Sequence, residues 1–316
     1  MRLRAPAIDD ASAVLEVLVA RDIADIGVPD YVLEDLLDEW RASELDLAAD
    51  SRVVELDGRI VAYAMARGPG TLVAVAPGYE GRGIGARLLD WAEARERELG
   101  RSQHRQWIGS GNKRGKTLLQ AAGYALARSY WRMGLRLEEL RDYPDTAPAG
   151  LRLRSLDVDR DASTLHALEA ASFAGAPDYH PESLQAYREE HLGAHDLDAQ
   201  LSRVAELGGQ IAGFLLARRW TEAPVGFVDI LAVHPDHQRN GIGTKLLLEA
   251  FRRFRAAGLQ EAQLGVASTN PRALRVYERL GMASRFRYDT YERPVVHSGQ
   301  SATAPEQSAQ PTPSNP

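Results

Sequence analysis

A polar, glycine-rich loop between two apolar segments carries the strongest sign of chemistry in this sequence. An apolar run ends at Val233, Pro235 stops it, and Gly241 and Gly243 open a segment whose apolar residues recur at helical spacing. Glycine lets backbone N–H groups approach a ligand closely, and a helix N-terminus adds unpaired donors and a positive dipole end. The loop therefore predicts a binding site for a diphosphate, although neither a P-loop nor a dinucleotide-binding fingerprint is present.

A second block downstream combines a helix start with a tyrosine. Asn270 is a good N-cap residue and Pro271 fits the first helical position, so capping alone would explain Asn270. Tyr277 follows Asn270 by seven residues, two turns further along the same helix face. A phenol is neutral at pH 7 and can donate a proton, whereas a tyrosine that only fills the core does no chemistry. Tyr277 is thus a candidate general acid.

Together the two blocks resemble the GCN5-related N-acetyltransferases, the GNAT family. The segment 238–243, Gln-Arg-Asn-Gly-Ile-Gly, matches the family's Q/R-x-x-G-x-G signature, and 270–282 matches its downstream helix. The resemblance implies acetyl-CoA as co-substrate, with its pyrophosphate on the loop amides and Tyr277 as the acid that protonates the leaving thiolate. It also implies that a backbone N–H near Ala232 or Val233 holds the thioester carbonyl, and it implies no metal. The cofactor-binding residues implied in this half are Leu231, Ala232, Val233, Gln238, Arg239, Asn240, Gly241, Ile242, Gly243, Thr244 and Asn270.

The acceptor amine must lose a proton when it attacks the thioester. The family often places a glutamate on the strand before the loop; that position is Phe227 here, and Asp229 lies two residues further along the same strand face. Asp229 is therefore our candidate for the catalytic base or a substrate anchor, with a structural hydrogen-bonding role as the alternative. Asp178, His180 and Glu182 fall where the family shapes its acceptor site, although each also fits an exposed loop.

The loop and its downstream block occur twice in the sequence. Gly83 precedes Gly241 by 158 positions, Asn112 precedes Asn270 by the same offset, and the correspondence runs unbroken over about 50 residues. A constant offset of this length indicates duplication of one structural unit.

The first copy lacks two features of the second. Glu80 stands where the second copy has Gln238, and a carboxylate is unfavourable beside a pyrophosphate; Leu119 stands where the second copy has Tyr277. We therefore expect one catalytic centre, in the second copy. The first copy is expected to be catalytically degenerate, either kept for its packing or able to bind acetyl-CoA without using it. The cofactor-binding residues implied in the first copy are Val73, Val75, Arg82, Gly83 and Gly85.

Strands and helices in a set order must position these blocks. Apolar or alternating runs predict strands in the second copy, and apolar residues at helical spacing predict helices. The expected fold class is α+β, a mixed α/β arrangement of two tandem GNAT domains, each a mixed, mostly antiparallel sheet flanked by helices. The expected strands of the second copy are 151–155, 203–207, 210–217, 226–233, 263–266 and 285–291, and the expected helices are 158–172, 181–190, 241–257 and 271–280.

Composition along the chain predicts the domain boundaries. Residues 1–140 form the N-terminal domain, and 151–295 form the C-terminal, catalytic domain. Between them, 141–150 holds two prolines and few apolar residues and is typical of a linker. The tail, 296–316, contains almost no large apolar residue, so it cannot offset the entropy of ordering and is expected to be disordered.

Bulk composition narrows the classes of partner. A net charge of −6 disfavours nucleic acid, and the absence of cysteine excludes thiolate metal sites and cysteine nucleophiles. No apolar stretch is long enough to span a bilayer, and the first residues lack the apolar core of a signal peptide. We therefore expect a cytoplasmic protein, a monomer or a homodimer, with no membrane partner.

The sequence thus predicts an N-acetyltransferase that moves an acetyl group from acetyl-CoA to a primary amine of a small molecule or peptide by direct attack. A narrower alternative is that the tandem arrangement, with its active second half, resembles the mycothiol synthases, which acetylate a cysteinyl-sugar amine. An alternative of another class is a non-catalytic tandem module that binds or senses acyl-CoA, which the departures at Glu80 and Leu119 would fit.

Overall fold

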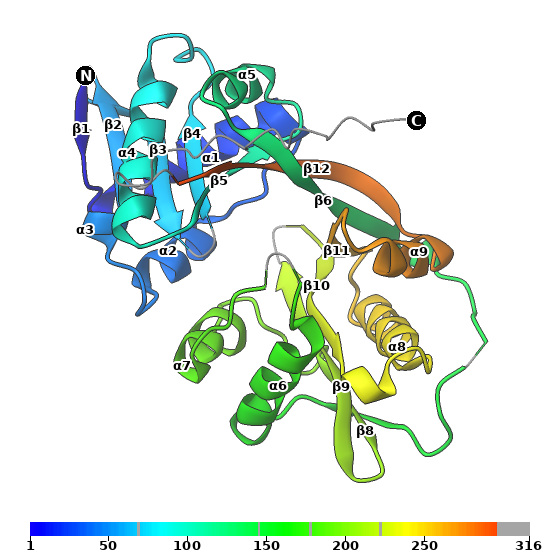
Figure 1. Cartoon of the computed structure of the whole chain (residues 1–316). Helices are drawn as coiled ribbons and strands as arrows, with labels where there is room; N and C mark the ends of the chain where they lie inside the picture. The colour runs from blue at the N-terminus through cyan, green and yellow to red at the C-terminus, as the bar shows by residue number, and fades with distance from the viewer. Residues whose placement is uncertain (68–69, 145, 177–178, 221–222, 296–316) are drawn as a thin grey trace, which may run out of the picture.

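Strands from both halves of the chain join in one sheet, which has twelve strands among the described residues. Their order is β1-β2-β3-β4-β5-β12-β6-β11-β10-β9-β8-β7 (Figure 1). Two neighbouring pairs, β4–β5 and β10–β11, are parallel and the others are antiparallel, so the expected mixed, mostly antiparallel sheet is confirmed. The strands are β1 (Arg2–Arg4), β2 (Ser51–Leu56), β3 (Arg59–Arg67), β4 (Gly70–Val75), β5 (Gln103–Gly109), β6 (Ala125–Arg136), β7 (Arg152–Ser155), β8 (Arg203–Leu207), β9 (Gln210–Trp220), β10 (Val225–Val233), β11 (Glu261–Ala267) and β12 (Ala283–Pro294).

The computed structural model describes residues 1–67, 70–144, 146–176, 179–220 and 223–295. The tail 296–316, which the sequence predicts to be disordered, lies outside these residues, as does Asp178. None of the helices in the described ranges is long and apolar enough to cross a membrane.

Helices cover both faces of the sheet. Along β3, Tyr63 and Met65 pack with α1, whereas the alternate residues Ala62 and Ala64 pack with α4. Successive side chains of a strand point to opposite faces, so α1 and α4 lie on opposite sides, and α6 and α8 repeat this arrangement on β9 and β10. The helices are α1 (Ala11–Ile26), α2 (Leu33–Arg41), α3 (Leu47–Asp50), α4 (Ile84–Glu98), α5 (Lys113–Ala121), α6 (Val158–Phe173), α7 (Leu184–Tyr187), α8 (Ile242–Ala256) and α9 (Pro271–Arg279).

The sequence repeat is visible in the element boundaries. The elements α8, β11, α9 and β12 each begin and end 158 residues after α4, β5, α5 and β6. The offset that marks the glycine loops therefore holds from the loops to the last strand of each copy. The expected elements of the second copy are found within a few residues, apart from the second helix.

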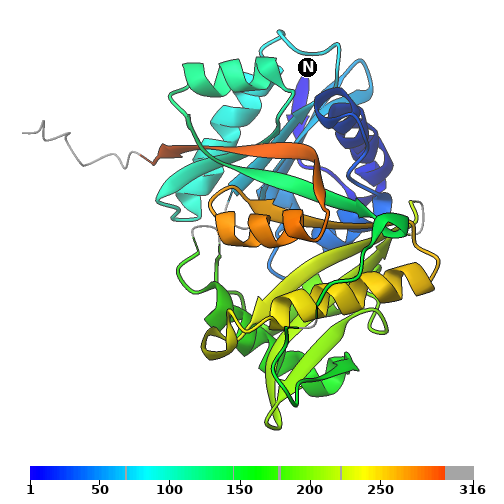
Figure 2. The ribbon, with the colours of Figure 1, turned by 90° about the vertical axis from the view of Figure 1, so that its right-hand side faces the viewer.

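The last strand of each copy is exchanged with the other copy. β12 lies between β5 and β6, and β6 lies between β12 and β11. Figure 2 shows these two long strands side by side between the two lobes. The sheet therefore has no break between the halves, and the boundaries 1–140, 141–150 and 151–295 stay predictions about the sequence repeat. Below, the first and second halves are residues 1–140 and 151–295.

The helix expected over 181–190 is wrong in its start and its form. α7 begins at Leu184, where Ser183 is the N-cap and its hydroxyl accepts a hydrogen bond from the Ala186 N–H at 3.0 Å. After Tyr187 the chain continues as a π-helical turn, Arg188–Leu192. Pro181 fits a first helical turn by residue type, but the serine cap begins the helix later. The wider π turn carries His191, whose ring contacts Asp229 of β10.

Candidate active site

The second glycine loop has the backbone geometry of an anion site. β10 ends at Val233, and Gly241, with φ of +79°, is the N-cap of α8. Glycine adopts this left-handed conformation without strain, and the first N–H groups of the helix have no partner within the helix itself. The Gln238 side-chain amide donates to the Val233 carbonyl oxygen at 3.2 Å and closes the loop. This geometry agrees with the predicted diphosphate site.

The other residues predicted to bind acetyl-CoA gather around this loop. Leu231 and Val233 pack against the core beneath α8, Ala232 belongs to the cluster that includes α6, and Ile242 is buried. The loop and the first turn of α8 carry the remaining ones, Arg239, Asn240, Gly243 and Thr244. Their contacts with acetyl-CoA stay predictions.

The linker lies directly over this loop. A Cβ built on Gly241 would stand 2.6 Å from the Thr146 carbonyl oxygen, whereas one built on the equivalent Gly83 would have nothing within 4 Å. The Tyr143 hydroxyl donates to the Arg279 carbonyl oxygen at 2.8 Å, which ties the linker to the end of α9. A ligand on this side of Gly241 would therefore have to displace the linker.

β10 and β11 separate where Asp229 stands. Their parallel pairing covers Val225–Val228 and Glu261–Leu264, and a bulge interrupts the pairing of β10 with β9 between Val228 and Ile230. A bulge bends its strand and increases the local twist. Beyond it, β10 follows β9 and β11 follows β6, so a wedge opens between β10 and β11.

One position distinguishes this wedge from its counterpart in the first half. Gly265 is the first residue of β11 beyond the pairing, and a Cβ built on it would have nothing within 4 Å. Its neighbours Leu264 and Val266 are buried beneath α8, so position 265 faces the opposite side of the sheet. In the first half, 158 residues earlier, Trp107 holds this position and lines two cavities at once. Trp107, which pairs with Leu72 of β4, therefore places an indole in the first half at the position where the second half has no side chain.

A cavity of about 700 Å³ lies beside the first glycine loop. Residues of the predicted set that line it are Val73, Val75, Gly83 and Gly85. Arg82 is not among the lining residues: its guanidinium lies 5.1 Å from the centre of the Tyr79 ring. The first half therefore has room for a ligand where acetyl-CoA is predicted, without Arg82.

The carboxylate of Glu80 does not stand unpaired beside that cavity. It forms an ion pair with Arg21 of α1 at 2.7 Å, and the same guanidinium donates to the Val75 carbonyl oxygen at 3.3 Å. Burial acts to raise the pKa of Glu80, but the hydrogen bond from Arg21, the backbone hydrogen bonds and the charge of Arg21 together outweigh it and lower that pKa below the ordinary value. Arg21 thus takes the place that Gln238 has at Val233 in the second half, and Glu80 serves as its counter-ion.

The tyrosine predicted as the acid is buried on α9. Tyr277 is 9% exposed in the core beneath α8, and burial raises the pKa of its hydroxyl to about 12, so the phenol stays protonated at neutral pH. Its counterpart Leu119 lies in a small apolar cluster. Asn270 caps α9 by accepting from the Ala273 N–H at 3.1 Å, which confirms the capping role. The roles of Tyr277 and Asn270 toward acetyl-CoA stay predictions.

Asp229 lies in a partly buried ionic network. Its Oδ2 atom accepts from Arg218 at 2.9 Å and lies 3.0 Å from Nδ1 of His191. Burial alone would raise the pKa of Asp229, but Arg218 and His191 outweigh it and hold that pKa well below the ordinary value. A carboxylate held in this way is a poor proton acceptor, so the geometry argues against Asp229 as the base. It agrees with the structural hydrogen-bonding role that the sequence also allowed.

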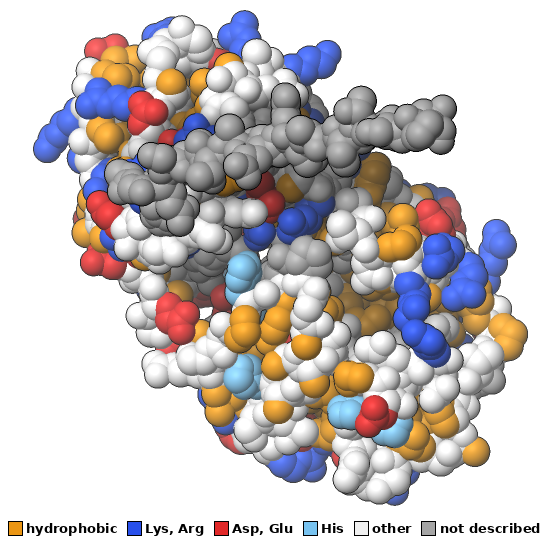
Figure 3. All heavy atoms as spheres, viewed as in Figure 1, with side chains coloured by type: hydrophobic (Ala, Val, Ile, Leu, Met, Phe, Trp, Pro, Cys, Tyr) orange, Lys and Arg blue, Asp and Glu red, His pale blue; other side chains and the backbone are white. Residues whose placement is uncertain are grey.

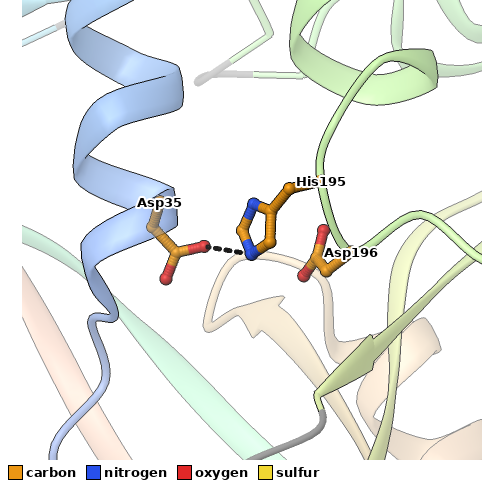
Figure 4. Close-up of side chains that lie close together, drawn as sticks. All are labelled: Asp35, His195 and Asp196. Atoms are coloured by element: carbon orange, nitrogen blue, oxygen red, sulfur yellow. Dashed lines mark ion pairs between the residues drawn. The ribbon is translucent and has the colours of Figure 1, made fainter.

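The network continues to the contact between the halves. Arg218 also pairs with Asp196, a buried residue, at 3.0 Å. The adjacent His195 turns toward α2 of the first half, with Nε2 3.8 Å from Asp35 (Figure 4). A line of charged groups therefore leads from Asp229 in the wedge to the surface of the other half.

A cleft of about 830 Å³ lies between the halves. Among the described residues, nine carboxylates line it, including Asp22 from the first half and Glu182 from the second. The described lining holds one arginine and the histidine His180 beside them. Figure 3 shows acidic side chains and a histidine at the junction of the two lobes. Burial raises the pKa of Asp22 to about 6. A surface of this charge attracts cations, and it includes the described residues predicted to shape the acceptor site, His180 and Glu182.

Sequence reasoning missed one residue of this cleft. Glu169 of α6 is 8% exposed and lines the cleft, and no described residue bonds to its Oε2 atom. Burial raises its pKa to about 7. A signal was present, because Glu169 shares the buried face of α6 with Ala162 and Leu165 at helical spacing, which places a carboxylate within an apolar stripe.

Comparison with known proteins identifies the family. The sequence profile of the acetyltransferase (GNAT) family matches residues 20–124 and 163–282, one region in each half and more than half of the chain together. The chain belongs to the GNAT family. This acetyltransferase is therefore an enzyme of the acyltransferase class, with the GNAT fold present twice.

Several known proteins are similar to this acetyltransferase over most of its length. The mycothiol acetyltransferase of Thermobispora bispora is 31% identical over 230 residues, which cover 67% of this chain and 72% of that protein. The solved GCN5-related N-acetyltransferase of Sphaerobacter thermophilus aligns over 93% of this chain and 95% of its own, with a TM-score of 0.74 and 25% identity. A tandem GNAT protein from the clavulanic acid biosynthesis pathway aligns over 94% and 99%, with a TM-score of 0.68 and 18% identity, and supports the fold alone.

Proposed function

We propose that this acetyltransferase moves the acetyl group of acetyl-CoA to a primary amine of a small molecule that enters the cleft between the halves. The observation that carries the proposal is the connection between the open wedge and the acidic cleft. Asp229 at the wedge contacts His191, and His191 lies 3.5 Å from Glu182, which lines the cleft. A thioester in the wedge and an ammonium group in the cleft would therefore meet on the α6 side of the sheet.

Three features support the second half as the site of transfer. Its wedge carries no side chain at Gly265, whereas the first half has the bulky Trp107 at this position. Tyr277 offers a protonated hydroxyl, whereas the first half has Leu119 at that position. The bulge at Asp229 interrupts the pairing of β10 with β9, and the corresponding pairing of β4 with β3 is regular. Acetyl-CoA bound at this half would place its diphosphate at Gly241 after the linker has moved.

The first half is proposed to bind acetyl-CoA without transferring the acetyl group. Its 700 Å³ cavity lies beside an unobstructed glycine loop, and Arg21 neutralises Glu80 there. These observations favour a sensing or structural site in this half, which is the part of the non-catalytic alternative that the geometry supports.

The acceptor is proposed to be a cation before it reacts. Nine carboxylates around one cleft favour an ammonium group over a neutral or anionic acceptor. The similarity to mycothiol acetyltransferases makes the amine of a cysteinyl-sugar compound the narrower candidate within this class.

A thiol-release assay against an amine panel tests the proposal. The panel holds a cysteinyl-sugar compound, aminoglycosides, polyamines and peptide N-termini, and calorimetry with acetyl-CoA counts the binding sites. The expected result is release of CoA with at least one cationic amine and binding at two sites, only one of which supports turnover. Acetyl-CoA binding without transfer to any amine would support the non-catalytic alternative and refute the proposed reaction.

A further inference from the structure

Glu169 is a buried carboxylate aimed into the acceptor cleft without a counter-ion bonded to Oε2. It is 8% exposed and lines the cleft, and its Oε2 atom has no hydrogen-bond partner within residues 1–67, 70–144, 146–176, 179–220 and 223–295. An unpaired carboxylate in such a place is costly, because burial disfavours the charged form. A group that keeps this cost at the mouth of a reaction site is a candidate for chemistry.

The neighbours of Glu169 link it to the wedge. Carboxylate oxygens of Glu169 and Glu182 and a ring nitrogen of His191 all lie within 4.8 Å of one another. The other ring nitrogen of His191 lies 3.0 Å from Asp229, the residue at the bulge. One imidazole therefore separates Glu169 from the point at which β10 and β11 part.

We propose that Glu169 is the base that takes the proton from the acceptor ammonium group, and that His191, fixed by Asp229 and Glu182, is the positioning residue that sets its proton affinity. The proposal rests on the proposed acetyl transfer and assigns to Glu169 the role that the sequence assigned to Asp229.

The proton and electron balance of the reaction is complete with these groups. Glu169 takes one proton from the ammonium group, and the lone pair of the free amine forms the new C–N bond at the thioester carbon. The C–S bond then breaks, and the Tyr277 hydroxyl protonates the CoA thiolate. The acceptor nitrogen then loses a second proton, which returns the Tyr277 hydroxyl to its protonated form. Glu169 releases the proton that it took from the ammonium group to solvent.

The electrostatics of the cluster agree with this role. Burial raises the pKa of Glu169 to about 7, and the repulsion of Glu182, Asp229 and Glu190 adds to this effect, whereas His191 opposes it. A base with this pKa is half ionised near neutral pH and can both accept and release a proton. Two further titratable groups near it, among the described residues, are the hydroxyls of Tyr179 and Tyr187, whose pKa values are raised above the ordinary value by burial and by Glu169.

His191 is cationic in this arrangement. Burial would lower the pKa of its ring, but hydrogen bonds to Asp229 and Glu182 outweigh it and raise the pKa to about 10. Arg218 keeps Asp229 ionised from the other side. A fixed positive charge beside Glu169 therefore prevents its pKa from rising further, which is the reason for the positioning role.

The decisive variant is Glu169→Gln in the full chain, with Asp159→Asn as the matched control. Asp159 is an exposed acid on the same helix and does not line the cleft. We expect Glu169→Gln to lower kcat/KM by about 10²-fold or more, the usual range for a general base, while acetyl-CoA binding by calorimetry stays unchanged. The acidic limb of the pH profile, near pH 7 in the parent enzyme, should disappear, and Asp159→Asn should retain the parent profile.

The positioning role has its own readout. In His191→Gln the positive charge beside Glu169 is gone, so the acidic limb should move to higher pH, a shift that a loss of folding or packing would not cause. Carboxyl carbon NMR of labelled glutamate gives a readout that needs no amine substrate. The resonance of Glu169 is assigned as the one that is lost in Glu169→Gln, and it should titrate near pH 7.

Four results would overturn the inference. The first two are full activity of Glu169→Gln and a titration of the Glu169 carboxyl near pH 4, its ordinary range. The third is an acidic limb of the pH profile that stays in place in His191→Gln. The fourth is activity that a chelator abolishes and Zn²⁺ restores, which would make Glu169 a metal ligand. If the parent enzyme transfers acetyl to no amine, the proposed function fails, and the NMR titration still judges the proton affinity assigned to Glu169.

Discussion

The contrast between Gly265 and Trp107 predicts that one substitution closes the second active site. A Cβ at Gly265 meets nothing within 4 Å, and position 265 faces away from the core beneath α8, so a side chain can start there without a clash. The indole of Gly265→Trp is expected to enter the space that the proposal assigns to the thioester. A displacement of about 1 Å already costs on the order of 10²-fold in rate. We therefore expect turnover to fall by at least about 100-fold, equivalent to about 2.7 kcal/mol in the barrier.

The same variant should not lose stability. Glycine inside a strand is unfavourable by roughly 0.5–1 kcal/mol, and an aromatic residue suits a strand, so the free energy of unfolding should stay equal or rise slightly. Gly265→Ala is the matched control, because its methyl group meets open space and should leave turnover within a few-fold of the parent. Urea unfolding and thiol release, measured on both variants, separate a blocked site from a misfolded one.

The reciprocal substitution tests whether the reaction takes place only in the second half. Trp107→Gly opens the first wedge but should create no second active centre, because Leu119 supplies no acid there. It removes the contact of the indole with Tyr130, whose ring centre lies 4.6 Å away, at a cost of about 1 kcal/mol for the ring pair beyond the loss of buried area. A Gly265→Trp enzyme that folds and retains full turnover would refute the assignment of the reaction to the second wedge.

Three further predictions follow from other parts of the structure. Tyr277→Phe should lower kcat by about 10²-fold or more and leave the calorimetric affinity for acetyl-CoA unchanged, because only the proton donor is lost; a kcat equal to that of the parent would exclude Tyr277 as the acid. Asp22, whose pKa burial raises to about 6, is ionised above that pH and neutral below it. Calorimetry should therefore show that a cationic amine binds more weakly as the pH falls through about 6, and that Asp22→Asn reduces this dependence to the part that comes from Glu169 near pH 7. Gly226→Ala should destabilise the protein by roughly 1–3 kcal/mol in urea unfolding, because a Cβ there overlaps the buried ring of Phe254, and an unchanged midpoint would contradict this packing.

Local patterns predicted the framework of the site. The glycine loop, the capped helix after Asn270 and the offset of 158 residues depend on short-range spacing, and the structure reproduces each of them. Backbone conformation at Gly241 and the cap at Asn270 are set by neighbouring residues in the chain, which is why single-sequence reasoning is reliable for them. The second helix was placed wrongly because Pro181 and Ser183 are competing start signals and only packing decides between them.

Charge relations inside the site could not be predicted in the same way. A carboxylate in an apolar strand is unusual, which makes Asp229 a candidate for base, substrate anchor or structural hydrogen bonding. The sequence does not show its partners Arg218 and His191, because they come from a neighbouring strand and from a π turn. Glu80 looked unfavourable because its partner Arg21 lies 59 residues away in the sequence. The pKa of a carboxyl depends on burial and on charges within a few ångströms, and neither is a property of the residue's neighbours in the chain.

The sequence by itself determined the family, the duplication and the inequality of the two halves, since these depend on residue types at fixed spacing. Tertiary structure alone decided that the last strands, β6 and β12, are exchanged, because long-range pairing leaves no signal in local periodicity. It also decided that residues of both halves line one acidic cleft, and that Asp229 is bonded to Arg218 whereas Oε2 of Glu169 has no hydrogen-bond partner among the described residues. The proton affinity of a carboxyl depends on burial and on charges that the fold brings together, so the base we propose, Glu169, becomes apparent only in the folded protein.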